Sequence, residues 1–309
     1  MKKYFLYVYL STGLIWAAED KSWEKGDVSS SIQEYNRYLQ QAIQDQDWWG
    51  VIDYADLISY NFPKSPFAQD MAFAMGEAYF NLWQLELANT CFSDYLNHTS
   101  SPRHFEKAIE YKFNIAEQFR NGVKKPLFGS HKMPKWLPAK EDAVAIYDEV
   151  ITTLPHSEFA AQSLLGKAQI QVELEDYKPS LETLDVLIRR FPKHDLAAAA
   201  YLEKGRVYLI QCQRKNLDTA LLDLAEVNLR KFRLAFPRES RLNQAETAIA
   251  EMQEIFATNL LDTGRFFEKT KKIPASLIYY NQVIAKYPNT EAASIARGQI
   301  ENLKTADHS

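Results

Sequence analysis

Glycine, proline and cysteine are all scarce in this 309-residue sequence, which contains ten glycines, twelve prolines and two cysteines. A β-protein with many tight turns needs more glycine and proline than this, so the composition favours helices. Cys91 and Cys212 lie about 120 positions apart in helical patterns, whereas a disulfide needs Cα atoms within roughly 7 Å. We therefore expect two unpaired cysteines that pack as small hydrophobic residues.

The usual signatures of catalysis and of metal or cofactor binding are also missing. None of the six histidines has a second histidine four positions away, the spacing of a helical zinc site. The sequence has no glycine-rich phosphate loop, no Gly-x-Ser-x-Gly elbow and no Cys-x-x-Cys pair. We therefore expect no enzymatic activity and no catalytic, cofactor-binding or metal-binding residues.

Positive charge is in slight deficit, with 36 Lys and Arg against 40 Asp and Glu, a formal net charge of -4. Such a field does not attract polyanions, so we expect no nucleic-acid partner. The hydrophobic content of 46% is enough for a sizeable core. Because compact domains rarely grow beyond about 250–300 residues, one elongated array and two domains are both compatible with the length.

The N-terminus has the three parts of a secretory signal peptide. Met1-Lys2-Lys3 is followed by an apolar run from Tyr4 to Trp16 and then by Ala17-Ala18. The run is shorter than the roughly 20 residues of a bilayer span. We predict a signal peptide over residues 1–18 and a short linker over 19–30. We expect export to the periplasm or to the periplasmic face of the outer membrane, where peripheral membrane association is possible; an uncleaved membrane anchor is the alternative.

A recurring pair, an aromatic residue or leucine followed by proline, is the strongest pattern after residue 30. The last four such prolines are 37, 45 and 51 positions apart, which is typical of helical repeats. In most cases a Ser, Thr or His follows two positions after the proline, and an alanine follows three positions later. The proline ends one helix and the polar side chain caps the next. The pairs are Phe62-Pro63, Leu154-Pro155, Phe191-Pro192, Phe236-Pro237 and Tyr287-Pro288.

Between these turns the apolar residues have helical spacing, so each unit is predicted to be a helical hairpin. Gly76-x-x-Tyr79 followed by Ala88-x-x-x-Phe92 matches the tetratricopeptide pattern, in which a small residue lies where two helices cross. Gly205-x-x-Tyr208 and Gly264-x-x-Phe267 repeat part of it. The predicted fold is all-α, a solenoid of stacked tetratricopeptide-like hairpins over 31–160 and 161–303, with a disordered tail at 304–309.

Residues 121–138 interrupt this pattern with three prolines and two glycines. Long loops inside repeat proteins are uncommon unless they have a function. Phe128 and Trp136, which lie beside four lysines, are candidates for a partner contact. A packed connecting loop with solvated lysines is the alternative.

The last repeats, from about Asn243 to Asn302, are the predicted partner surface. One helix cannot turn all the apolar residues of 278–284 toward a single core stripe, so some should remain exposed. We expect aromatic anchors with a basic rim that attracts an acidic partner. The alternative is that these aromatics only close the core. The candidate partner-binding residues here are Arg265, Phe266, Lys269, Lys271, Lys272, Tyr279 and Tyr280.

The order of these features resembles the BamD family of outer-membrane-protein assembly factors. The features are the signal sequence, the aromatic-proline turn, the Gly76–Phe92 repeat, the interrupted repeat at 121–138 and the closing hairpin at 263–293. The resemblance implies a BamA-type barrel-insertion protein and unfolded outer-membrane proteins as partners. Family members are usually lipoproteins with a lipid-modified cysteine, and the signal region of this chain has no cysteine. A general scaffold of cell-wall or secretion machinery in the envelope is the alternative function.

Overall fold

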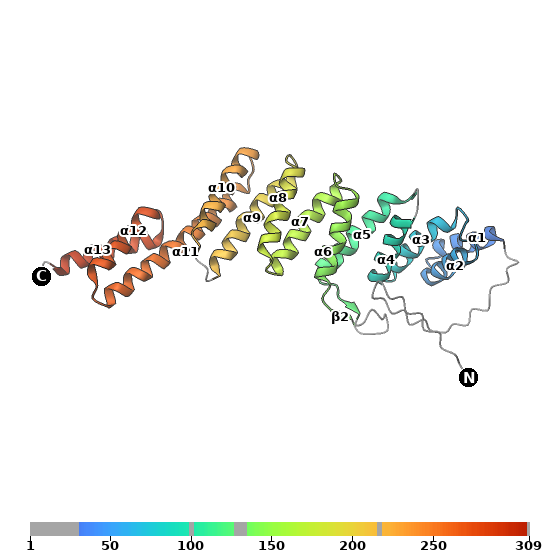
Figure 1. Ribbon diagram of the computed structural model, residues 1–309, viewed down its shortest axis with the longest axis horizontal. Coiled ribbons are helices and arrows are strands. Elements are labelled where there is room, and N and C mark those ends of the chain that lie inside the picture. Colours follow the sequence, from blue (N-terminus) through green and yellow to red (C-terminus); the bar gives the residue numbers. More distant parts are fainter. Residues whose placement is uncertain (1–30, 99–101, 127–134, 215–217, 308–309) are drawn as a thin grey trace, which may run out of the picture. The chain divides into compact units, whose positions relative to one another are not determined.

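The computed structural model describes residues 31–98, 102–126, 135–214 and 218–307. The predicted signal peptide (1–18), the linker (19–30) and Phe128 lie outside these ranges. The described chain is all-α apart from one short strand pair, and its helices follow one another as tetratricopeptide-like hairpins, as the sequence predicts (Figure 1).

The chain divides into two compact units, Met1–Ile170 and Gln171–Ser309, which we call the N-terminal unit and the C-terminal unit. The boundary falls inside α7 (Glu158–Glu173). Before it lie α1 (Ile32–Gln44), α2 (Trp48–Asn61), α3 (Ala68–Asn81), α4 (Leu85–His98), α5 (Phe105–Arg120) and α6 (Lys140–Thr153). After it lie α8 (Tyr177–Arg190), α9 (Asp195–Gln213), α10 (Ala220–Ala235), α11 (Leu242–Lys269), α12 (Ile273–Lys286) and α13 (Glu291–Asp307).

The turns between hairpins are alike in all five aromatic-proline or leucine-proline pairs. The residue before each proline has φ between -126° and -134° and ψ between 51° and 69°. A residue before proline is kept out of the helical region by its clash with the proline ring, so each helix ends there. The prolines that follow these residues are Pro63, Pro155, Pro192, Pro237 and Pro288.

Hydroxyl groups cap the helices after these turns, as predicted. Ser157 Oγ accepts a hydrogen bond from the N–H three residues later over 3.1 Å and donates to the carbonyl three residues earlier over 2.8 Å. Thr290 Oγ1 makes the same two bonds over 3.1 and 2.7 Å. At the equivalent position His194 accepts at Nδ1 from Leu196 N over 3.1 Å. The repeated sequence pattern therefore corresponds to a repeated local structure.

A second family of turns, inside the hairpins, repeats just as regularly. Gln46, Trp83, Gly122, Glu175 and Lys271 have φ of 57°, 56°, 94°, 66° and 58°. In each turn the next N–H reaches the carbonyl five residues back over 2.7–3.0 Å, which is a Schellman helix end. The sequence does not reveal this repeat, because glycine occupies only one of the five left-handed positions.

Glycines occupy tight helix crossings, as expected from the tetratricopeptide pattern. A Cβ at Gly76 would lie 2.7 Å from the Phe92 ring, and one at Gly264 would lie 2.5 Å from the Tyr280 ring. No side chain fits between such surfaces, which explains why glycine is needed there. Tyr79 and Ala88 are buried beside the first crossing, as predicted.

The hairpin that contains Gly205 differs from this prediction. The nearest atom to a Cβ at Gly205 is Asn228 Nδ2, 4.0 Å away, so no aromatic ring presses on it. Asn228 is buried and donates from Nδ2 to Tyr201 O over 2.8 Å. Tyr208 is also buried. Gly205 is therefore not a tight crossing, because an asparagine occupies the place that an aromatic ring takes elsewhere.

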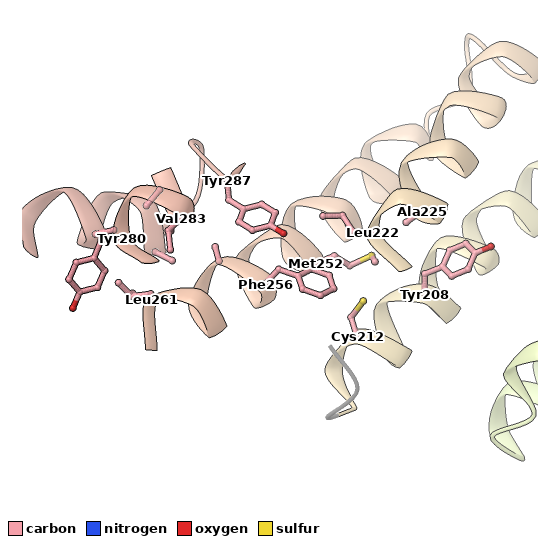
Figure 2. Close-up of a cluster of buried hydrophobic side chains, with 14 residues drawn as sticks. Tyr208, Cys212, Leu222, Ala225, Met252, Phe256, Leu261, Tyr280, Val283 and Tyr287 are labelled. Carbon is pink, nitrogen blue, oxygen red and sulfur yellow. The ribbon is translucent and has the colours of Figure 1, made fainter. Parts of the chain in front are cut away.

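Figure 2 shows the main core of the C-terminal unit, to which α9, α10, α11, α12 and α13 contribute. Met252, Phe256 and Leu261 extend along α11, with Leu261 beside Tyr280 and Val283 of α12 and Met252 toward Leu222 of α10. A smaller cluster lies where the start of α11 meets α9 and α10. The long helix α11 therefore joins both clusters of this unit.

The described parts of the interrupting segment and of the C-terminal tail have regular structure, which for residues 304–307 differs from the predicted disorder. Strand β1 (Lys125–Pro126) pairs antiparallel with β2 (Lys135–Leu137), so the described ends of the 121–138 segment form a two-stranded ladder. Helix α13 continues to Asp307, and residues 304–307 are therefore helical rather than disordered. The Thr305 hydroxyl bonds to carbonyls of the preceding turn, which helps this last turn to form.

Candidate protein-docking surface

The predicted partner residues in the C-terminal unit lie around one turn, where α11 ends and α12 begins. The left-handed residue Lys271 makes this turn. We define the docking surface as the aromatic and basic side chains near this turn that are exposed or half-buried, together with Ile278. These are Arg265, Phe266, Phe267, Lys269, Lys271, Lys272, Ile278 and Tyr279.

Three aromatic rings form the apolar part of the docking surface. The rings of Phe267 and Tyr279 stack with centroids 5.4 Å apart and an interplanar angle of 11°. Phe266 meets Phe267 edge to face at 5.6 Å and is itself 61% exposed. The row therefore runs from the half-buried rings of Tyr279 and Phe267 to the exposed ring of Phe266. Ile278, which is 58% exposed, adds a fourth apolar side chain to the surface.

Tyr280 does not belong to this surface, contrary to the prediction. It is fully buried, packs against Gly264 and donates its phenolic hydrogen bond to Glu268 Oε2 over 2.5 Å. Burial raises the pKa of Tyr280 to about 12. Neighbouring residues on a helix point in different directions, so Tyr279 faces outward and Tyr280 faces the core.

Three lysines lie at the turn between the helices that carry the aromatic row. Lys269, Lys271 and Lys272 are exposed, and none of them forms an ion pair within the part of the chain that the structure describes. Arg265 is partly buried and contacts Asp262 over 3.2 Å. Three uncompensated positive charges beside exposed aromatic rings favour an acidic partner with apolar side chains.

The other candidate contact, in the 121–138 segment, belongs to the N-terminal unit. Trp136 lies in β2 and is 69% exposed, whereas Phe128 is outside the described residues. Lys125 Nζ bonds to Asp142 over 2.6 Å, so this lysine of the segment is already neutralised. The described part of the segment offers one exposed ring and no aromatic row.

Sequence reasoning missed a second group of exposed apolar residues. Leu224, Val227 and Leu234 lie on the outer face of α10. Their positions, i, i+3 and i+10, were visible in the sequence, but apolar residues at helical spacing are ordinarily assigned to a core.

Neither a membrane span nor a metal site is found in residues 31–98, 102–126, 135–214 and 218–307. No helix in these ranges is both long enough and apolar enough to cross a bilayer. Over the same residues, no three His, Cys, Asp or Glu side chains converge in a way that could hold a metal ion.

Solved structures and curated sequences say little about function. A tetratricopeptide repeat protein from Parabacteroides merdae is 11% identical, with 86% of this chain and 96% of that chain covered and a TM-score of 0.37. MamA from Desulfovibrio magneticus is 13% identical, with 69% and 99% covered and a TM-score of 0.35. No curated protein matches the chain. Scores this low carry no functional conclusion.

A family model is more informative. The model described as YfiO, Outer membrane lipoprotein, matches residues 135–304, which is more than half of the chain and includes the whole docking surface. Proteins of this family are protein-binding scaffolds rather than enzymes, so protein–protein interaction is the class of function. The chain therefore belongs to the YfiO family of BamD-like outer membrane lipoproteins.

Proposed function

We propose that this chain is a non-enzymatic periplasmic scaffold that assists the assembly and insertion of β-barrel outer-membrane proteins. A BamA-type protein and unfolded outer-membrane proteins are its proposed partners. The observation that carries the proposal is the family match over residues 135–304, because the docking surface lies entirely inside it.

The chemistry of the docking surface supports a protein partner. Binding hot spots are enriched in aromatic residues that lie inside a polar rim. Phe266, Phe267 and Tyr279 provide such anchors, and Lys269, Lys271 and Lys272 provide a positive rim. The proposed interface therefore attracts an acidic partner from a distance and holds it through the aromatic row.

Surface substitutions in the full chain test this proposal. Phe266→Ala should weaken binding to purified periplasmic domains of a BamA-type protein by about tenfold or more, the effect of a hot-spot residue. Lys271→Glu with Lys272→Glu should slow association, and the slowing should fade at high salt. Binding can be followed by surface plasmon resonance.

The matched control is Tyr60→Ala, which removes a side chain that is 77% exposed in the N-terminal unit. It should leave affinity unchanged. If Phe266→Ala bound like the parent while Tyr60→Ala weakened binding, the partner surface would belong to the N-terminal unit. Deleting α11 to α13 is a poorer test, because Tyr208 and Leu222 would lose the core that covers them.

The periplasmic location is tested at the N-terminus. We expect the mature protein to begin at Ala18 or Glu19, since Ala17-Ala18 follows the apolar run. Mass spectrometry of protein from the native envelope measures this directly. An intact Met1 on a cytosolic protein would contradict export.

A further inference from the structure

The outer face of α10 exposes aliphatic side chains that the core does not use. Leu224, Val227 and Leu234 are 48%, 38% and 82% exposed, although the residues of α10 that face the core are buried. Together with Lys231 they follow an i, i+3, i+7, i+10 spacing, which places them in one line along the helix. We call these four residues the outer stripe.

Unpaired positive charges accompany the outer stripe. Arg230, Lys231 and Arg238 are exposed and form no ion pair in the described part of the chain. Arg233, on another side of α10, is instead paired with Glu246 over 2.6 Å. Three unpaired cations thus accompany the exposed aliphatic side chains of α10, in a chain whose net charge is negative.

The nearby acidic residues leave the C-terminal half of the stripe positive. Asp223 and Glu226 lie near its beginning, beside Leu224. Leu234, the most exposed of the aliphatic residues, lies at the other end, where Arg238 follows after the turn. A negatively charged surface would therefore meet the half from Val227 to Arg238.

We infer that the outer stripe of α10 is a membrane-contact surface that rests on an anionic phospholipid bilayer. Aliphatic residues with Lys and Arg on one helix face are the composition of helices that lie in the membrane interface. The long stems of Lys231 and Arg230 can cover apolar surface while their charged ends reach lipid phosphates. Anionic lipids attract basic residues close to the membrane surface.

A bilayer fits the outer stripe better than a protein does. Leucine and valine are under-represented among protein-binding hot spots, which favour tryptophan, tyrosine and arginine in pockets. The docking surface of the same unit has an aromatic row, whereas the outer stripe contains no aromatic residue. Leu234 is 82% exposed, and it needs no complementary pocket in order to enter a headgroup layer.

A polarity-sensitive fluorophore on Leu234→Cys in the full chain tests this inference. Burial raises the pKa of Cys91 to about 12 and that of Cys212 to about 11, so both natural thiols label slowly. We expect a blue shift of emission with phosphatidylcholine vesicles containing phosphatidylglycerol, and little shift with phosphatidylcholine alone. The same fluorophore on Lys178→Cys, an exposed site in α8, should not shift.

Charge reversal completes the test. In the chain labelled at position 234, Lys231→Glu should weaken vesicle binding about tenfold, as expected for removing and reversing one charge at the surface. Lys178→Glu makes the same charge change elsewhere and should have no effect. The inference is overturned if the emission of the fluorophore at position 234 does not shift with anionic vesicles, or if neutral and anionic vesicles shift it equally. No BamA-type partner is present, so this result is separate from that of the docking surface.

Discussion

The two units use the same hairpin but join neighbouring hairpins by different interactions. In the N-terminal unit, Lys112 of α5 is only 1% exposed. Its ammonium group donates to Asn89 Oδ1 over 2.7 Å and to Ser93 Oγ over 2.6 Å, and it meets Glu149 Oε2 at 2.7 Å. One buried charge therefore ties α4, α5 and α6 together.

A second polar network lies farther along the same unit. The Tyr147 hydroxyl donates to Glu117, which also accepts from Arg120 over 2.5 Å. Arg120 in turn donates to Gln169 of α7 over 3.0 Å. Burial and the bond to Glu117 raise the pKa of Tyr147.

The C-terminal unit is joined by apolar packing between its helices. Its main core is built from aliphatic and aromatic side chains of five helices (Figure 2). Its most specific polar tie is Glu254, whose carboxylate accepts from the N–H groups of Glu291 and Ala292 over 2.8 and 2.9 Å. This carboxylate caps the start of α13 and favours it electrostatically.

Some features of the repeat are common to both units, and others differ between them. Turn geometry is shared, because it depends on a few backbone positions. The polar contacts between hairpins differ, since the buried Lys112 network lies in the N-terminal unit and Glu254 caps α13 in the C-terminal unit, whereas apolar side chains fill the cores of both. Removing a partner of Lys112 should therefore destabilise the N-terminal unit, and removing side-chain volume from the main core should destabilise the C-terminal unit.

The largest effect is expected in the C-terminal unit from Tyr280→Ala. Tyr280 fills the crossing at Gly264 and is fully buried, so its loss should lower the free energy of unfolding by about 3–5 kcal/mol. Urea denaturation measures this. Ile278→Ala, on the exposed face of the same helix, is the control and should cost less than about 1 kcal/mol.

Ala88→Leu should destabilise the N-terminal unit through overpacking. Ala88 is fully buried beside the crossing of Gly76 and Phe92, and forcing extra methyl groups into such a site costs about 1–3 kcal/mol. Asn97→Leu, at an exposed position of the same helix, is the matched control. Equal melting temperatures for the two variants would contradict the packing assigned to this crossing.

The polar character of the N-terminal unit is tested at Lys112. Glu149→Ala removes a partner from a buried charge and should cost about 1–3 kcal/mol. Lys112→Met removes the charge and keeps most of the volume, so it should cost less than Glu149→Ala. If Lys112→Met lowered stability more than Glu149→Ala did, the interactions of the Lys112 charge would stabilise the fold by more than the cost of burying that charge.

Alkaline pH should weaken both units. Burial raises the pKa of Tyr79 to about 12, as it does for Tyr280. The unfolded phenol ionises near its ordinary value of about 10, while the folded phenol keeps its proton. Stability that is fully present below pH 10 is therefore lost as pH rises from about 10 to 12. Tyr280→Phe should flatten this loss in the C-terminal unit, as followed by circular dichroism.

The smallest effect should come from the turns that both units share. Lys271 has a left-handed backbone conformation just after α11, and glycine adopts this conformation without strain. Lys271→Gly should therefore stabilise the chain by a few tenths of a kcal/mol, or change nothing. Lys269→Gly, two positions earlier and helical, should destabilise it by about 1 kcal/mol. Equal losses at the two positions would contradict the Schellman geometry.

Much of the fold could be predicted because its signals are local. Proline at Pro155 ends a helix, Ser157 caps the next, and Gly76 marks a crossing, all through interactions within a few residues or one neighbour. The left-handed turns could not be predicted, because Trp83 and Glu175 are not glycines and yet adopt a left-handed conformation. The backbone preference of non-glycine residues alone would place both at negative φ.

The candidate surfaces were less predictable. Tyr279 and Tyr280 are adjacent and chemically alike, yet one stacks on Phe267 at the surface and the other is buried under Gly264. Gly205 has the same sequence signature as Gly264, but Asn228 removes the ring that would press on it. Each outcome depends on a residue far away in the chain.

The sequence by itself determined the all-α hairpin architecture, the positions of the proline turns and the resemblance to a family, because periodicity, proline and capping act over short distances. Only the tertiary structure decided which apolar side chains remain outside. Phe266 and Leu234 are exposed, while Tyr280 and Phe232 are buried. The physical reason is that burial depends on what packs against a helix face, and a helix's own sequence does not specify its neighbour.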